Sequence, residues 1–137
     1  MILVDAGPLI ALIHKDDRHH QRCVDVLRSL SEPLASVWPV ITEAMYLLSF
    51  SWKAQDALWE MIERDVVTVL PIEERELSRM REVMKKYRDL PMDLADAALV
   101  AVAEREKIRR IFTLDRRDFA LYRPGRLGRF IILPGSS

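Results

Sequence analysis

Short apolar runs that alternate with helical segments are the feature that most limits how this chain can fold. The first run is Ile2-Leu3-Val4, and similar runs recur along the 137 residues. Strands made only of apolar residues are typical of parallel sheets, because helices bury both faces of such sheets. We therefore predict a three-layer α/β/α fold around a five-stranded parallel sheet. The predicted strands are 2–4, 34–37, 66–70, 110–113 and 130–133.

Helices are predicted in the segments between these strands. Pro8 suits the first position of one helix, and Pro91 is expected to begin another, because proline fits the first turn without losing a hydrogen bond. On a charged helix, the spacing of Leu77, Met80 and Met84 predicts a buried face. The predicted helices are 8–13, 19–30, 39–50, 52–64, 73–87 and 91–106.

The length and the cysteine content narrow the class of protein. A chain of 137 residues predicts a single domain over 1–137. Its apolar runs are far shorter than the roughly 18–20 residues of a membrane helix, and no signal peptide is visible, so we expect no membrane association. Cys23 is the single cysteine, which excludes an internal disulfide and a cysteine-based zinc site. A reducing, cytoplasmic setting fits this composition.

The charges of the chain balance overall but are unevenly distributed. There are 21 basic and 21 acidic residues. From Arg105 to Arg129, however, nine basic and three acidic residues give a net charge of +6. This segment is either a patch that faces phosphate groups or an ordinary solvated surface, and charge alone leaves both interpretations open.

Several acidic residues are expected near one edge of the sheet, where ligands of such folds bind beyond the carboxyl ends of the strands. Asp5 follows the first strand and Asp115 follows the fourth. Asp93 and Asp96 are three residues apart at the start of a predicted helix, which places them on one face. A structural interpretation remains open, since aspartates also cap helices and favour helix N-termini.

Glu43 is expected to complete this group. It lies on an otherwise apolar helix, so it is either partly buried beside the aspartates or exposed in the first turn. We expect Asp5, Asp96 and Asp115 to occupy comparable positions, with Glu43 able to reach them. Asp118 is interpreted as a surface or structural residue.

Carboxylates gathered in this way predict a metal site. Several of them within a few ångströms cannot all ionise without a cation, and Mg²⁺ or Mn²⁺ prefers oxygen ligands. One or two such ions can activate water and stabilise the leaving oxygen of a phosphoryl displacement. The basic residues Arg116 and Arg117 next to Asp115 would then contact a phosphate backbone.

Four stretches of the sequence, in this order, resemble the PIN domain of metal-dependent ribonucleases. The resemblance is greatest to VapC-type toxins of prokaryotic toxin–antitoxin modules. It implies a PIN-like fold, endonucleolytic cleavage of RNA with Mg²⁺ or Mn²⁺, a homodimer, and a small antitoxin partner. The four stretches are LVDAGPL (3–9), ITEA (41–44), DAALVA (96–101) and TLDRRDF (113–119).

The same resemblance implies roles for individual residues. Asp5, Glu43 and Asp96 fall on the central acidic positions of the family, and Asp115 falls on the fourth. The auxiliary positions are Asp93, an additional acid, and Thr113, a hydroxyl near the metal site.

Other functions are also considered. A PIN-fold nuclease outside a toxin–antitoxin module and a non-enzymatic PIN-fold binding module both remain open. A signalling receiver is disfavoured because the third strand ends in Leu70-Pro71-Ile72 without an aspartate, and a dehalogenase-type phosphatase is disfavoured by Gly7. The tryptophans are either anchors of the core or of an interface, or platforms for RNA bases; they are Trp38, Trp52 and Trp59.

Overall fold

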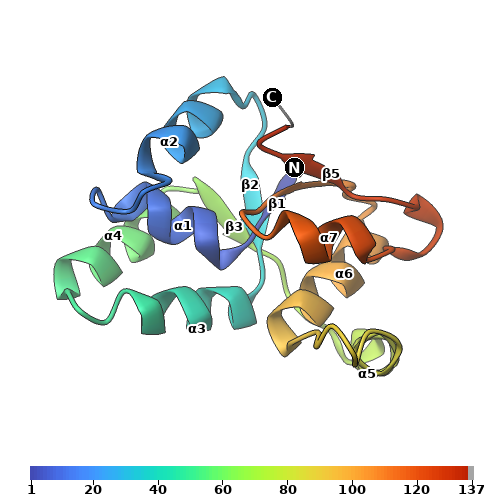
Figure 1. Ribbon diagram of the computed structural model, residues 1–137. Coiled ribbons are helices and arrows are strands. Elements are labelled where there is room, and N and C mark those ends of the chain that lie inside the picture. Colours follow the sequence, from blue (N-terminus) through green and yellow to red (C-terminus); the bar gives the residue numbers. More distant parts are fainter. Residues whose placement is uncertain (136–137) are drawn as a thin grey trace.

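The chain folds around a five-stranded parallel sheet, as predicted (Figure 1). The computed structural model describes residues 1–135. The order of the strands is β3-β2-β1-β4-β5, and every neighbouring pair is parallel. The strands are β1 (Ile2–Val4), β2 (Leu34–Ser36), β3 (Val67–Val69), β4 (Arg110–Phe112) and β5 (Ile131–Leu133).

The order of the strands creates a crevice at the centre of the sheet. From β1 the chain adds β2 and β3 on one side, and then crosses to add β4 and β5 on the other side. Such a reversal leaves a gap between the two central connections at the carboxyl ends of the strands, where ligands of open α/β sheets bind. Here that position lies beyond the ends of β1 and β4.

Helices cover the sheet in two groups, which makes the fold the predicted three-layer α/β/α arrangement (Figure 1). In one group, α1 packs against α2, α3 and α4; in the other, α5 packs on α6, and α6 also contacts α3. The helices are α1 (Ala6–Ile13), α2 (His20–Ser29), α3 (Trp38–Leu47), α4 (Trp52–Glu63), α5 (Leu77–Lys86), α6 (Leu94–Glu106) and α7 (Arg116–Leu121), with the 3₁₀ turns η1 (Glu74–Glu76) and η2 (Gly125–Leu127).

The start of α6 differs from the prediction. Pro91 lies outside the helix, and α6 begins after Asp93, whose side chain accepts a hydrogen bond from the backbone N–H of Asp96. An aspartate cap offers an acceptor to the first turn, whereas proline only tolerates that position. Similarly, α1 begins at Ala6, so Pro8 is its third residue.

The predicted helix over 73–87 is divided, and its buried face is rotated. It consists of η1 followed by α5, and Leu77, the first residue of α5, is 55% exposed. The prediction that Leu77 is buried was therefore wrong, while Met80 is buried as expected and Val83 is fully buried. The 3₁₀ turn changes the phase of the helix, which brings Glu76 rather than Leu77 towards the core.

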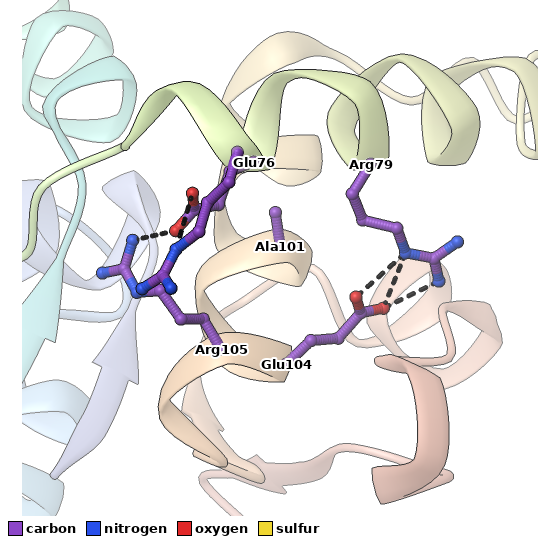
Figure 2. A pocket seen from close by; sticks show the side chains of 6 residues that line it. Glu76, Arg79, Ala101, Glu104 and Arg105 are labelled. Carbon is purple, nitrogen blue, oxygen red and sulfur yellow. Dashed lines mark hydrogen bonds and ion pairs between the residues drawn. The ribbon is translucent and has the colours of Figure 1, made fainter.

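Buried and half-buried ion pairs fasten η1 and α5 to α6 (Figure 2). The buried Glu76 carboxylate accepts a hydrogen bond from the guanidinium of Arg105, which also donates to the carbonyl of Pro71 at 2.7 Å. Further along, Arg79 donates three hydrogen bonds to Glu104, at 3.1, 2.9 and 2.7 Å. These pairs attach the C-terminal end of α6 to η1 and α5.

Several arginines of the basic segment, residues 105–129, form contacts with other groups of the protein. Arg105 pairs with Glu76, and Arg110 pairs with Glu32 near the N-terminus. Arg109 donates to the backbone carbonyl of Arg129 at 2.8 Å. Among residues 1–135, no helix is both long enough and apolar enough to cross a membrane.

Candidate active site

Asp5 and Thr113 join the carboxyl ends of the two central strands. Asp5 follows β1, and its backbone N–H donates to the carbonyl of Phe112 at 3.0 Å. Thr113 follows β4 and is fully buried. Its hydroxyl donates to Oδ2 of Asp5 at 3.0 Å and accepts from the backbone N–H of Asp115 at 3.0 Å. One threonine therefore orients Asp5 and the segment that carries Asp115.

Three aspartates of the site are also helix caps. Asp5 precedes α1, Asp93 precedes α6 and Asp115 precedes α7, and each side chain accepts a hydrogen bond from its own helix. The capping interpretation of these three residues is therefore correct. Helix N-termini stabilise negative charge, which offsets some of the repulsion between these groups. The bonds are Ala6 N–H to Asp5 (2.8 Å), Asp96 N–H to Asp93 (2.8 Å) and Asp118 N–H to Asp115 (3.2 Å).

Asp96 reaches the site from the first turn of α6 rather than from the end of a strand. Its Oδ2 accepts a hydrogen bond from the hydroxyl of Tyr122 at 2.8 Å. Tyr122 is fully buried, and its ring packs edge-on against Tyr87 and Phe119. The phenol thus fixes the orientation of the Asp96 carboxylate. The sequence alone gave no reason to select Tyr122, because it lies 26 residues beyond Asp96.

The structure adds Asp118 to the cluster of carboxylates. Asp96, Asp115 and Asp118 each offer an oxygen atom within 4.8 Å of the others. The interpretation of Asp118 as a surface or structural residue was incomplete. Its backbone N–H donates to the cap of α7, and its carboxylate also belongs to the acidic cluster. A signal for this was present in the sequence, because residues three apart share a helix face.

The electrostatics of the site show how closely the acidic residues lie. Burial raises the pKa of Asp96 to about 8, and the charges of Asp5, Asp93 and Asp115 contribute to the increase. Burial also raises the pKa of Asp5, with contributions from Asp93 and Asp115. The pKa of Glu43 is raised by burial and by the charges of Asp5 and Asp93. The structure therefore brings together the acidic residues that the sequence singled out.

Glu43 borders a groove beside the cluster. It projects from α3 and is more exposed than the aspartates Asp5 and Asp96. The groove has a volume of about 560 Å³ and runs between the first turns of α3 and α6. It is lined by Trp38, Pro39, Thr42, Glu43, Asp93, Leu94 and Ala95.

The donor set fits a hard divalent cation. The side-chain oxygens at the site come from carboxylates and a threonine hydroxyl, which are suited to Mg²⁺ or Mn²⁺. Burial is the main cause of the raised pKa values of Asp5, Asp96 and Asp115, and the charges of neighbouring carboxylates add to it, so a bound cation would stabilise the ionised forms. Asp5, Asp96 and Asp115 are the residues that would hold an ion, with Asp118 within reach of the latter two.

The two arginines after Asp115 take different positions. Arg116 donates a hydrogen bond to the carbonyl of Pro134 beyond β5. Arg117 is exposed, and its charge lowers the pKa of Asp115, whereas burial and Asp118 raise it. A contact of either arginine with RNA stays a prediction.

Several known proteins resemble this chain in sequence or in fold. Ribonuclease VapC26 of Mycobacterium tuberculosis is 27% identical over 135 residues, which cover 97% of this chain and all of that protein. The crystal structure of VapC20 from M. tuberculosis, a toxin that cleaves the sarcin-ricin loop, superposes with a TM-score of 0.77 at 19% identity and covers 85% of this chain and 92% of the other. A toxin-antitoxin complex from Klebsiella pneumoniae gives a TM-score of 0.68 at 18% identity and covers 88% and 91%. The family model of the PIN domain matches residues 2–124, and the chain therefore belongs to the PIN domain family.

Proposed function

We propose that this protein is a Mg²⁺- or Mn²⁺-dependent endoribonuclease and the toxin component of a VapBC-type toxin–antitoxin system. The observation that carries the proposal is the acidic group at the central crevice of the sheet, where Asp96, Asp115 and Asp118 each offer an oxygen within 4.8 Å of the others and Thr113 links Asp5 to the segment that carries Asp115. The names of the similar proteins support it, since one is a ribonuclease and two are toxin structures. An RNA substrate also fits the expected cytoplasmic location.

In the proposed reaction, a water oxygen bonds to phosphorus and the bond from phosphorus to the 3′ oxygen breaks. The products carry a 5′ phosphate and a 3′ hydroxyl. A bound divalent ion would supply charge stabilisation for the phosphate and lower the pKa of water. Asp5, Asp96 and Asp115 would hold the ion, and Glu43, whose pKa is raised, is suited to accept the proton that the attacking water releases. The leaving 3′ oxygen takes up a proton from solvent water.

Other residues position these groups. Thr113 orients Asp5, Tyr122 orients Asp96, and Asp93 fixes the first turn of α6. Arg117, exposed beside Asp115, is proposed to contact the RNA backbone together with Arg116.

The test is cleavage of labelled single-stranded and structured RNAs in Mg²⁺, Mn²⁺ or EDTA. Asp96→Asn is expected to lower cleavage at least about 100-fold while the far-ultraviolet circular dichroism stays unchanged. Asp56→Asn is the matched control, because Asp56 is an exposed carboxylate on α4. Cleavage that persists in EDTA, or in the folded Asp96→Asn variant, would contradict the proposed site.

A homodimer and an antitoxin complex form the second part of the proposal. Large apolar side chains are exposed around the junction of α3 and α4, where a protein partner would bury them. The proposal is supported by the similar structure from K. pneumoniae, which is a toxin-antitoxin complex. The exposed residues are Tyr46, Leu47, Phe50 and Trp52.

A further inference from the structure

Trp38 borders the groove beside the acidic cluster. It is the first residue of α3 and 49% exposed, and it lines the same groove as Glu43 and Asp93. Trp52 and Trp59 do not line that groove. The three tryptophans are therefore not equivalent: Trp52 and Trp59 lie seven residues apart on α4, and Trp38 alone borders the groove.

The groove combines an apolar wall with the edge of the proposed active site. Leu94, 54% exposed at the start of α6, lies across the groove from α3. Exposed large apolar side chains on two separate helices are unfavourable in water unless a ligand covers them. Because Glu43 and Asp93 belong both to the groove and to the acidic cluster, a molecule in the groove is contiguous with a phosphate held at the cluster.

The ring of Trp38 lies near a second indole. The ring of Trp59 on α4 is 6.4 Å away at an interplanar angle of 53°. The hydroxyl of Thr42 donates to the backbone carbonyl of Trp38 at 3.0 Å, so the hydroxyl proton is already used. A half-exposed indole is suited to stack on a flat ring, and every nucleobase has such a face.

We propose that the groove between the first turns of α3 and α6 is a nucleobase subsite, in which Trp38 stacks on an unpaired base next to the scissile phosphate. The charge of the groove favours this occupant. Glu43 and Asp93 make its rim acidic, so a second phosphate is disfavoured, whereas a neutral base with N–H groups matches both the apolar wall and the carboxylate acceptors. A paired base cannot present its face in this way, so the subsite selects single-stranded or looped RNA.

The subsite is tested first by binding, without cleavage. A Trp52→Phe/Trp59→Phe/Asp96→Asn variant retains Trp38 as its single tryptophan, and a Trp38→Phe/Trp59→Phe/Asp96→Asn variant retains Trp52. A single-stranded RNA octamer in Mg²⁺ is expected to quench the fluorescence of the first variant saturably and to leave the second unchanged. Absence of saturable quenching in the folded Trp38-only variant, or equal quenching in both variants, would overturn the subsite.

The second test uses cleavage and rests on the proposed nuclease function. Removal of one stacking platform in Trp38→Ala is expected to lower kcat/KM on single-stranded RNA by about 5- to 150-fold. Trp38→Phe should recover part of the loss, and Leu77→Ala, at an exposed apolar side chain on α5 outside the groove, should have no effect. If Trp38→Ala cleaves RNA as well as the parent does, the subsite is contradicted and the nuclease function is not. If the parent cleaves no RNA but the fluorescence of the Trp38-only variant is still quenched, the nuclease function is contradicted and the subsite is not.

Discussion

Asp96 makes the stability of the metal-free protein depend on pH. Its pKa is about 8 in the folded chain and about 3.9 in an unfolded one. Between these values the folded state keeps a proton that the unfolded state has lost, so a rise in pH favours unfolding. We expect the midpoint of thermal unfolding in EDTA to fall as the pH is raised from 5 to 8.

Two comparisons isolate the cause of this pH dependence. Asp96→Asn should remove most of the decrease and make the metal-free protein more stable than the parent at pH 8. Saturating Mn²⁺ should also raise the midpoint of the parent at pH 8, since a ligand that binds only the folded state stabilises it. An unchanged pH profile in Asp96→Asn would show that other groups dominate.

Thr113 is expected to act on metal binding through Asp5. Thr113→Val keeps the shape of the side chain but removes the hydrogen bonds to Asp5 and to the backbone of Asp115. Loss of such an outer contact typically weakens metal binding by about 10- to 100-fold. Calorimetric titration with Mn²⁺ measures the change, and Thr113→Ser, which restores the hydroxyl, should recover most of the affinity. Equal Mn²⁺ affinities of Thr113→Val and Thr113→Ser would contradict the role of the Thr113 hydroxyl in metal binding.

At the scale of elements, the ion pair between η1 and α6 is expected to contribute strongly to stability. Arg105→Met removes the hydrogen-bonding partner of the buried Glu76 carboxylate and leaves it, among the described residues, only the 3.7 Å ion pair with the exposed Arg75. Breaking a buried pair in this way typically costs about 3–5 kcal/mol. Arg79→Met breaks the more exposed pair with Glu104 and should cost about 1 kcal/mol or less. Urea unfolding compares the two variants, and the double variant Glu76→Leu/Arg105→Met should recover much of the loss. If Arg105→Met and Arg79→Met lower the free energy of unfolding by similar amounts, burial does not determine how much each ion pair contributes.

The elements also show what the sequence could predict. Apolar runs such as 2–4 and 110–113 are local signals, so the strands and their parallel arrangement followed from them. Leu77 was misplaced because a 3₁₀ turn changes helical phase, which hydrophobic spacing does not reveal. The contact of Tyr122 with Asp96 depends on how α7 and the segment after it pack against α6, and no pattern in a single sequence specifies this packing.

At the scale of the whole molecule, the exposed apolar side chains between α3 and α4 predict self-association. The parent is expected to have twice the mass of the 15.9 kDa chain in solution. Trp52→Glu places a charge among Tyr46, Leu47 and Phe50 and should shift the protein to the monomer. Light scattering coupled to gel filtration measures the mass, with Asp56→Asn as a control on the same helix. A monomeric parent at high concentration would contradict the dimer.

The hydrogen bond from Thr113 to Asp5 spans 108 positions of the sequence. During synthesis on the ribosome, a chain that has emerged only through α6 holds Asp5, Glu43 and Asp96 but lacks Thr113, Asp115 and the caps of α7. Such a nascent chain has no complete site with which to attack the RNA that surrounds it. Because β4 pairs with β1, the proposed ribonuclease activity can arise only after the segment around β4 has folded against β1.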